Sequence, residues 1–334
     1  MIKNIEIKNI TVFDKFKTNF STGINIFIGA NGTGKTHLLK LLYAVESAPL
    51  KGLLIRDIIQ KILQVFLPYE DSLKRLVRRV RGEKRKGKFS IGINSNIISI
   101  ELINTKNANN KIPGNWYKKG KSVVYIPVKE MLSNSPGFRS LFKKRDISFE
   151  EIYDDIIAWA FLPPLKKIEK EEKKILDLLK KIIGGQIVVK NEAFFLKTNT
   201  GEIEFHLVAE GIRKLALLWL LIRNGTLEKG STLYWDEPEA NLNPYLMPVV
   251  VEVLLALERI GVQIFIATHS YVIIKEFELQ REDHSMCFFT LYKDDCDSVQ
   301  LNKSQVYHNL SPNKISEAFT RIYDLEIEQA MEIK

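Results

Sequence analysis

Cysteine is scarce in this 334-residue sequence, which contains Cys287 and Cys296 and no others. Two cysteines are too few for a disulfide framework, and by themselves they do not make a metal site. A reducing compartment, the cytoplasm, is therefore the expected location of the protein.

Long hydrophobic runs are also missing. The longest, Leu215–Ile222, is far shorter than the roughly 20 residues that a membrane-spanning helix needs, and it suits a buried helix. Near the N-terminus, Ile5 and Ile7 alternate with polar residues as in a half-buried strand, so we expect no signal or transit peptide. These absences favour a cytoplasmic protein that does not associate with membranes.

Basic residues outnumber acidic ones by 49 to 40, which gives a net charge of +9. Such an excess favours polyanionic partners but does not indicate a fold. Much of it is concentrated in one basic cluster, residues 74–88, made of Lys74, Arg75, Arg78, Arg79, Arg81, Lys84, Arg85, Lys86 and Lys88. The cluster is a candidate nucleic-acid contact because lysine and arginine neutralise phosphates. A solvated helix face is the alternative interpretation.

A phosphate-binding loop is the clearest motif. Gly29-Ala30-Asn31-Gly32-Thr33-Gly34-Lys35-Thr36 matches G-x-x-x-x-G-K-[ST] at every fixed position, between an apolar strand and a helical pattern. Glycines let backbone N–H groups curl around phosphate oxygens, and the following helix directs its positive end at the same anion. We expect Lys35 to contact the β- and γ-phosphates of ATP and the Thr36 hydroxyl to ligate Mg²⁺. The expected nucleotide-binding set comprises these eight residues and His37.

Two further apolar strands end in polar residues suited to phosphate chemistry. The strand Leu233–Trp235 is followed by Asp236, expected to hold Mg²⁺, and by Glu237, expected to position or polarise the attacking water. The strand Val262–Ala267 leads to His269, at the edge of an α/β sheet where ligands collect. This histidine is a candidate γ-phosphate contact, although a lone histidine is more often structural.

The order of these motifs resembles the ABC-type ATPase heads of the RecF, SMC and overcoming-lysogenization-defect group. Within that group it most resembles the compact ATPases of bacterial anti-phage systems, such as the Septu and retron-associated kind. The resemblance is carried by Ile5–Ile10, Gly23–Ile26, Tyr125–Glu130 and Asp236–Leu242. It implies an α/β P-loop NTPase with a mixed sheet, an antiparallel β subdomain and helical insertions. It also implies ATP hydrolysis in which Lys35, Glu237 and His269 are catalytic.

The family's signature turn, which clamps the γ-phosphate of the partner chain, is the main departure. Glu210 and Gly211 occupy its place, but Ala209 stands where a serine is usual. Arg213 or Lys214 is a candidate source of compensating charge, and an ordinary helix cap is the alternative. Family heads of this kind pair around two ATP molecules, and a loop that holds Asn241 here then crosses the interface. The resemblance therefore implies a homodimer formed through an ATP sandwich.

The motifs divide the chain into five segments. We expect the start of the P-loop lobe at residues 1–45, a basic helical insertion at 46–87, and a β subdomain reaching the Tyr-Ile-Pro segment at 88–130. A helical subdomain follows at 131–185. Residues 186–334 hold the signature, the Asp-Glu strand and the histidine strand, and end in two strands and a helix.

The region after Ser270 shows no carboxylate cluster of the kind that two-metal nucleases use. If the chain acts with a nuclease or toxin effector, we therefore expect that effector to be a separate protein. Two other functions stay open. One is an ATP-dependent scaffold with little turnover, and the other is a transporter ATPase, which the altered signature disfavours.

Overall fold

The computed structural model describes residues 1–48, 54–80, 82–83, 85–102, 112, 121–145 and 147–332. Arg81 and Lys84 of the basic cluster lie outside the described residues, and so does most of the stretch between residues 103 and 120. None of the described helices combines the length and the hydrophobicity that a membrane span requires.

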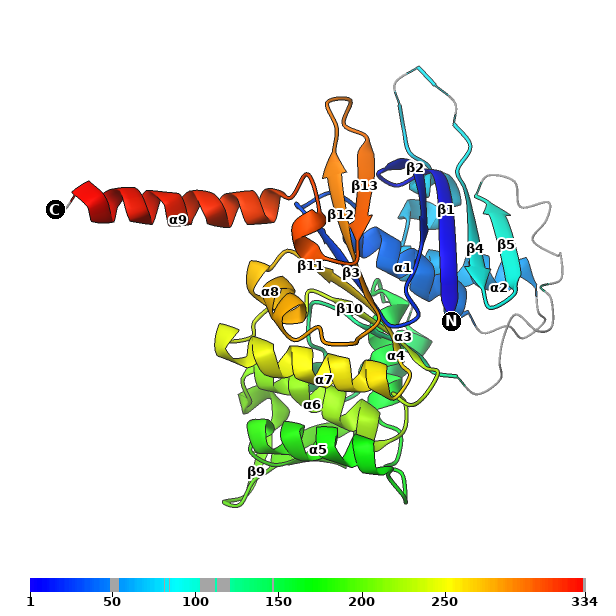
Figure 1. The fold of residues 1–334 in the computed structure, drawn as a ribbon. Helices are drawn as coiled ribbons and strands as arrows, with labels where there is room; N and C mark the ends of the chain where they lie inside the picture. Colours follow the sequence, from blue (N-terminus) through cyan, green and yellow to red (C-terminus); the bar gives the residue numbers. More distant parts are fainter. Residues whose placement is uncertain are drawn as a thin grey trace.

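A six-stranded mixed sheet forms the centre of the molecule (Figure 1). Its strands, in spatial order, are β13 (Val299–Ser304), β12 (Met286–Lys293), β3 (Ile24–Gly29), β11 (Gln263–Thr268), β10 (Thr232–Asp236) and β6 (Val123–Ile126). Neighbours pair in parallel except β12 and β13, which are antiparallel. β3, β10 and β11 are buried along their whole length, as expected for strands covered on both faces.

A second, four-stranded antiparallel sheet covers one side of the centre, in the order β2-β1-β4-β5. Its strands are β1 (Ile2–Ile10), β2 (Phe13–Asn19), β4 (Lys88–Ile93) and β5 (Asn96–Glu101). Their apolar residues share one hydrophobic cluster with helix α1 (Lys35–Glu46) and with Phe27, Phe265 and Phe289 of the central sheet. Segments 1–45 and 88–130 therefore each contribute to both sheets. β1, β2, β4 and β5 form the antiparallel sheet, whereas β3 and β6 belong to the central sheet.

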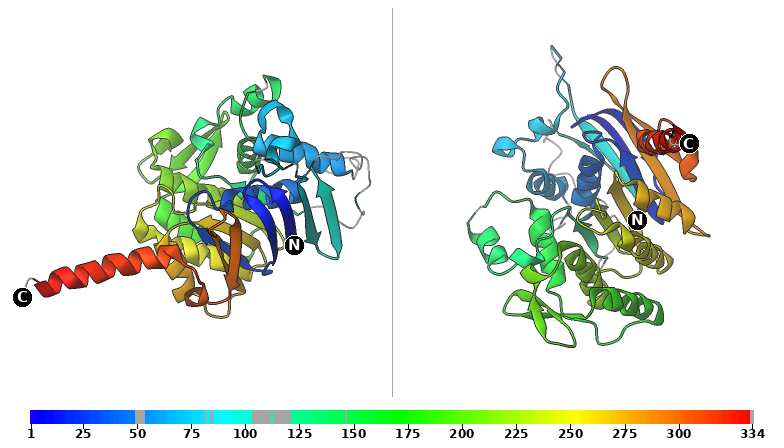
Figure 2. Two further views of the ribbon diagram at one scale, coloured as in Figure 1. Left: turned by 90° about the horizontal axis from the view of Figure 1, so that it is seen from above. Right: turned by 90° about the vertical axis from the view of Figure 1, so that its left-hand side faces the viewer.

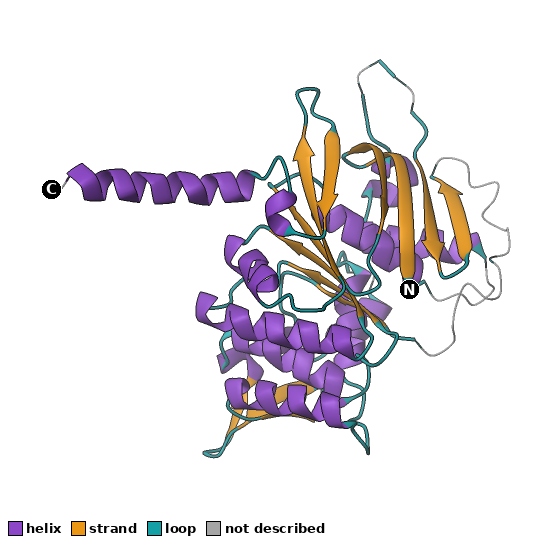
Figure 3. Ribbon diagram, in the orientation of Figure 1, coloured by secondary structure: helices purple, strands orange, loops and turns teal. Residues whose placement is uncertain are grey.

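Helices cover the other face of the central sheet (Figures 2 and 3). They are α3 (Phe138–Lys144), α4 (Glu151–Ala160), α5 (Lys170–Ile183), α6 (Glu210–Arg223), α7 (Met247–Arg259) and α8 (Tyr271–Leu279). A three-stranded meander of β7 (Gln186–Lys190), β8 (Ala193–Lys197) and β9 (Glu202–Glu204) lies between α5 and α6 in the chain. Helix α6 is buried on all sides from Lys214 to Ile222, which explains why Leu215–Ile222 is apolar without interruption.

The prediction that the whole insertion at 46–87 is helical is wrong. Helix α2 spans only Ile55–Phe66; Leu67 is left-handed with φ 43°, and two short 3-10 turns follow, Tyr69–Asp71 and Leu73–Leu76. Pro68 disfavours the α conformation in the residue before it, and like charges three or four residues apart would repel on a helix. The described residues of the basic cluster between Leu76 and the start of β4 at Lys88 are therefore irregular backbone.

The last helix, α9 (Lys314–Glu332), extends away from the body of the molecule (Figure 1). It follows the β12–β13 hairpin and the 3-10 turn Tyr307–Asn309. The side chains of residues 317–331 are all exposed.

Candidate nucleotide-binding site

The phosphate loop joins the end of β3 to the start of α1, and its glycines are required by their surroundings. Gly34 has φ 90°, and a Cβ there would lie 2.5 Å from Cγ2 of Val12. Gly29 has φ 154°, and a Cβ there would lie 2.3 Å from the carbonyl oxygen of Leu291. Gly32 also has a positive φ, 78°, but faces open space. The turn between β1 and β2 and the strand β12 thus fix the shape of the loop, and Gly32 stays open to a ligand.

Lys35 lies inside the curve of this loop. Its Nζ donates to the carbonyl oxygens of Gly29, at 2.7 Å, and Ala30, at 3.1 Å. Burial lowers the pKa of Lys35, and the nearby carboxylates of Glu237 and Asp236 oppose that shift. In the absence of a ligand, two carbonyl oxygens partner this buried cation. The charged oxygens of a nucleotide's phosphates would be stronger partners for it.

Asp236 joins the loop to the neighbouring strands. One of its oxygens accepts a hydrogen bond from Thr36 Oγ1 at 3.2 Å, and the other accepts one from the Tyr125 hydroxyl at 3.2 Å. Burial raises the pKa of Asp236 to about 6, and the charge of Glu237 adds to this, while Thr36 and Tyr125 oppose it. A cation beside Thr36 and Asp236 would favour the carboxylate form.

The donor set around Asp236 fits magnesium. Mg²⁺ commonly takes one or two protein oxygens and completes its octahedron with waters and substrate phosphates. The described residues contain no group of three or more His, Cys, Asp or Glu side chains that could hold a metal alone. Thr36 and Asp236 would hold Mg²⁺ together with a bound nucleotide.

Glu237 and His269 face each other at the ends of β10 and β11. His269 Nδ1 lies 3.2 Å from Glu237 Oε1, and both side chains are partly exposed. Glu239 fixes this arrangement, because its Oε1 accepts hydrogen bonds from Thr268 Oγ1, at 2.6 Å, and from the His269 backbone N–H, at 3.1 Å. Glu237 itself has a left-handed backbone, φ 48°. The pair can therefore act on a group bound at the adjacent phosphate loop.

The predicted signature residues pack against the loop that follows Glu237. Gly211 is buried, and a Cβ there would lie 2.7 Å from the Asn241 carbonyl oxygen. Glu210 is the first residue of α6, and Asn241 is exposed with φ 60°. Buried Lys214 donates to the Ala240 carbonyl oxygen at 2.6 Å. Helix α6 thus positions this loop within one chain.

The cations suggested as replacements for the missing signature serine are already engaged. Lys214 is bound as above, and burial lowers its pKa. Arg213 Nε lies 2.7 Å from Oε2 of buried Glu130, and its Nη1 donates to the Phe205 carbonyl oxygen. In this structure both cations hold their own chain together, so compensation by either requires these contacts to break.

The structure brings five of the predicted residues together, namely Lys35, Thr36, Asp236, Glu237 and His269. His37 differs, because its ring lies 6.0 Å from the Phe66 ring and burial lowers its pKa. Its backbone N–H stays available in the first turn of α1. Sequence reasoning missed the contacts of Tyr125, Glu239 and Lys214, whose partners are set by strand order and helix packing.

The basic cluster lies over the turn between β1 and β2. Arg78 donates to the carbonyl oxygens of Val12 and Asp297, so it joins this turn to the β12–β13 hairpin. Arg85 bonds to Asn9 and Asp14. These two arginines therefore have structural roles, unlike the free cations expected from the sequence.

Three lysines, one of them Lys88 of the cluster, lie side by side on the exposed face of the antiparallel sheet, and Glu101 on β5 is the next residue across. Lys8 on β1 is directly opposite Lys15 on β2 and Lys88 on β4, and all three are exposed. Like charges in directly opposite positions destabilise a sheet. A polyanion on this face would relieve that repulsion.

The arrangement of a phosphate loop, a following Asp-Glu strand and a histidine strand in one mixed sheet defines an ABC-type head of the P-loop NTPase class. The family model described as "AAA domain, putative AbiEii toxin, Type IV TA system" matches residues 24–275, and the chain belongs to that family. The expected α/β fold is confirmed, including the mixed sheet and the antiparallel subdomain.

Two solved SMC heads share the fold at low sequence identity. One is the SMC head bound to the C-terminal winged-helix domain of ScpA, with TM-score 0.56 and 13% identity over 95% of this chain and 99% of that one. The other, an SMC head with an extended coiled coil bound to the C-terminal domain of ScpA from Pyrococcus furiosus, gives TM-score 0.57 and 11% identity over 97% and 99%.

Curated relatives match over a short stretch only. The DNA replication and repair protein RecF of Lactobacillus johnsonii is 45% identical over 42 residues, which is 13% of this chain and 11% of RecF. RecF of Streptococcus pyogenes serotype M1 is 43% identical over the same length. The match thus spans about a tenth of these relatives.

Proposed function

We propose that the chain binds Mg-ATP at the phosphate loop and hydrolyses it to ADP and phosphate. The proposal is supported chiefly by the convergence of Lys35, Thr36, Asp236, Glu237 and His269 at the ends of three parallel strands. ATP would supply the reactive phosphoanhydride, and Mg²⁺ would neutralise its charge. Lys35 binds the phosphates, Glu237 orients and polarises the attacking water, and His269 contacts the γ-phosphate.

Steady-state phosphate release tests the hydrolysis. We expect Glu237→Gln to bind Mg-ATP but to lose at least about a hundredfold in rate, because the amide cannot polarise water. Lys35→Ala should lose binding. Glu282→Gln is the matched control, since Glu282 is exposed and paired with Arg259 away from the loop. If wild-type release is no faster than that of Lys35→Ala, the chain is a scaffold that does not turn over ATP.

We also propose that the complete site forms between two chains, with Glu210, Gly211 and Asn241 of one facing the phosphate loop of the other. Mixing two inactive variants tests this. Ala209→Glu places a negative charge at the exposed signature position, whereas Glu237→Gln leaves the signature intact. An equal mixture should recover about a quarter of wild-type activity, since half of the dimers are mixed and each holds one intact site. Activity no higher than the mean of the two variants would contradict a shared site.

Closure around ATP would switch what the dimer holds, because a ligand shifts an equilibrium toward the state it binds better. The lysine row of Lys8, Lys15 and Lys88 favours nucleic acid as the partner. The family resemblance suggests anti-phage defence or DNA maintenance, with a separate nuclease or toxin as effector.

Nucleic-acid binding is tested by its salt dependence. A triple variant that replaces Lys8, Lys15 and Lys88 with glutamine should flatten the slope of log K against log salt for a duplex by about three, one unit per lost phosphate contact. The control replaces Lys173, Lys180 and Lys181, which are exposed on α5. Equal slopes for the two variants would show that Lys8, Lys15 and Lys88 do not contact the phosphates of the duplex.

A further inference from the structure

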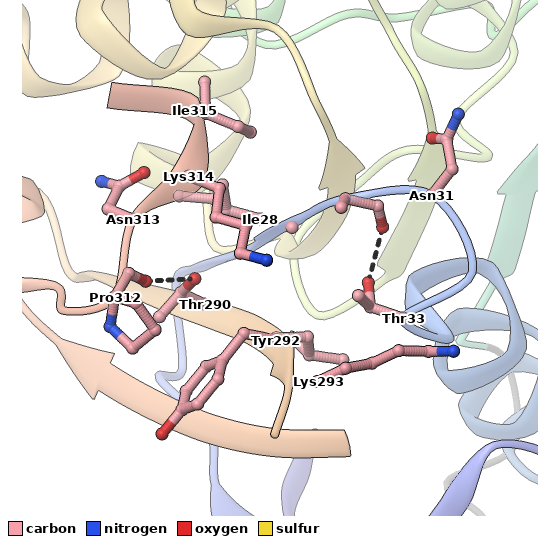
Figure 4. A pocket seen from close by; sticks show the side chains of 13 residues that line it. Ile28, Asn31, Thr33, Thr290, Tyr292, Lys293, Pro312, Asn313, Lys314 and Ile315 are labelled. Atoms are coloured by element: carbon pink, nitrogen blue, oxygen red, sulfur yellow. Dashed lines mark hydrogen bonds between the residues drawn. The ribbon is translucent and has the colours of Figure 1, made fainter. Parts of the chain in front are cut away.

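A basic pocket of about 320 Å³ lies at the opposite end of β3 from the phosphate loop, a volume that suits a small molecule. Figure 4 shows a different pocket, which contains Asn31 and Thr33 of the phosphate loop. Strand β3 has six residues, so its two ends are about 17 Å apart. The basic pocket forms where β2 ends, β12 begins and β13 ends, and its polar lining includes Asn19, Ser21, Arg281, His284, Ser285 and Lys303.

Two cations of the basic pocket have no carboxylate partner among the described residues. Arg281 lies after α8, and its Nη1 donates to the Gln305 carbonyl oxygen. Lys303 is exposed on β13, and its ammonium group makes no ion pair or hydrogen bond with any described residue. Glu282, the neighbour of Arg281 in the chain, pairs instead with Arg259, and neither of these lines the basic pocket. Two unpaired cations in one pocket favour an anionic ligand.

The hydroxyl groups of the basic pocket are held in place by the fold. Two fully buried amides fix the backbone of Ser21: Asn25 Oδ1 accepts from its N–H at 2.8 Å, and Gln263 Nε2 donates to its carbonyl oxygen at 2.9 Å. Ser21 Oγ lies 2.8 Å from Ser285 Oγ and 3.1 Å from the Ser285 carbonyl oxygen. When Ser21 donates to this carbonyl, the Ser285 hydroxyl is free to turn to a ligand. A donor fixed in this way binds at little ordering cost.

His284, in the wall of the basic pocket, lacks a hydrogen-bond partner on one ring nitrogen. Only 7% of the residue is exposed, and its Nδ1 lies 2.6 Å from Glu258 Oε2, so this carboxylate favours a proton on Nδ1. The other nitrogen, Nε2, is buried and has no partner among the described residues. A buried polar atom of this kind indicates a missing partner. A phosphate group suits either form of the ring, because its oxygens accept from an imidazolium and its hydroxyl donates to a neutral imidazole.

We propose that the basic pocket binds the phosphoryl group of a small molecule, either free phosphate or a phosphate monoester. Arg281 and Lys303 would supply the charge, and the Ser285 hydroxyl would be a directed donor. Hydrogen bonds from cations to phosphate oxygens are stronger than those between neutral groups, so a few contacts suffice for a small ligand. The site is separate from the phosphate loop and does not rest on the proposed ATP hydrolysis.

Calorimetry with two probes, inorganic phosphate and AMP, tests the proposal. The chain carries Lys35→Ala and the buffer lacks magnesium, so that the phosphate loop does not compete for the probes. We expect saturable binding that Lys303→Gln weakens at least about fivefold, because this variant removes one charge and no contact of the free chain. Lys180→Gln, at an exposed position of α5, is the matched control and should leave the affinity unchanged.

The two probes distinguish the sources of the phosphoryl group. Tighter binding of AMP would support a monoester, and binding of AMP no tighter than that of phosphate would support free phosphate. No binding of either probe at millimolar concentration would overturn the proposal. Equal affinities of Lys303→Gln and Lys180→Gln would overturn it as well, because the probes would then bind elsewhere.

Cys287, which is partly exposed and lines the basic pocket, gives an independent test. Burial raises the pKa of its thiol, and the charges of Lys303 and Arg281 oppose this shift. In a chain carrying Lys35→Ala and Cys296→Ser, phosphate should slow alkylation of Cys287 by iodoacetamide, because it blocks access and offsets the charges that favour the thiolate. Half of the protection should be reached at the concentration that half-saturates the calorimetric signal. Alkylation that phosphate slows no more than potassium chloride of equal ionic strength would overturn the proposal.

Discussion

At the scale of single residues, the site depends on charges that are buried before any nucleotide binds. Lys35 donates hydrogen bonds to carbonyl oxygens of its own loop, and Asp236 accepts hydrogen bonds from two hydroxyl groups. Both groups are costly to bury in charged form without a partner. If the chain binds Mg-ATP as proposed, part of the binding energy would come from relieving this cost.

Asp236 should make the stability of the free protein depend on pH. Its pKa is about 6 in the folded chain against 3.8 for the unperturbed group, so the folded state prefers the protonated form. The contribution of Asp236 to the free energy of unfolding is therefore fully present below pH 3.8. It is lost as pH rises through 6, which lowers the free energy of unfolding by about 2–3 kcal/mol. In urea denaturation without magnesium, the free energy of unfolding of Asp236→Asn should exceed that of wild type by this amount above pH 7. Near pH 4 the two free energies should be equal. A difference that does not change with pH would contradict this.

The Tyr125 hydroxyl should matter for the reaction. Tyr125→Phe removes one hydrogen bond to Asp236 and should lower kcat/KM for ATP by about fivefold, the equivalent of about 1 kcal/mol. Tyr234→Phe is a matched control, because Tyr234 is opposite Tyr125 in the adjacent strand but bonds to Glu46 instead. Equal losses in the two variants would point to a packing effect.

The residues of this site were predictable from the sequence to different degrees. Gly29–Thr36 and Asp236-Glu237 follow from local spacing, since each motif lies within one strand and its turn. The contacts of Tyr125 with Asp236 and of Lys214 with Ala240 depend on which strands and helices become neighbours. Local spacing carries no such information.

At the scale of elements, the phosphate loop is held by the strand turn beside it. Gly34 is pressed against Val12, whereas Gly32 faces open space, although both have positive φ. Gly34→Ala should therefore cost at least about 1 kcal/mol more in the free energy of unfolding than Gly32→Ala. If urea denaturation gives the same loss of unfolding free energy for Gly34→Ala and Gly32→Ala, backbone strain at positive φ accounts for the loss and the contact with Val12 does not.

The predictions of secondary structure failed in the basic segment 67–87. Alternating or continuous apolar patterns located β3, β10, β11 and α6 to within a few residues. Residues 67–87 were predicted as part of a basic helical insertion. Pro68 and the crowding of like charges instead leave irregular backbone, held by Arg78 and Arg85.

At the scale of the whole molecule, chain segments that are far apart share each layer. The antiparallel sheet combines β1 and β2 with β4 and β5, and the central sheet takes strands from residues 24 to 304. Linear segment boundaries consequently describe this fold poorly. The interleaving brings the phosphate loop and the start of α9 to one edge of the molecule, where they line the same pocket.

Isothermal titration calorimetry with Mg-ATP measures whether the phosphate loop binds a nucleotide, on which the proposed hydrolysis depends. The wild-type chain should bind one ATP per chain, and Lys35→Ala, folded by circular dichroism, should show no binding heat. Bound nucleotide should also stabilise the wild type by about 2.7 kcal/mol at a hundredfold excess over Kd. No binding by the wild type, or equal binding by both chains, would contradict the account.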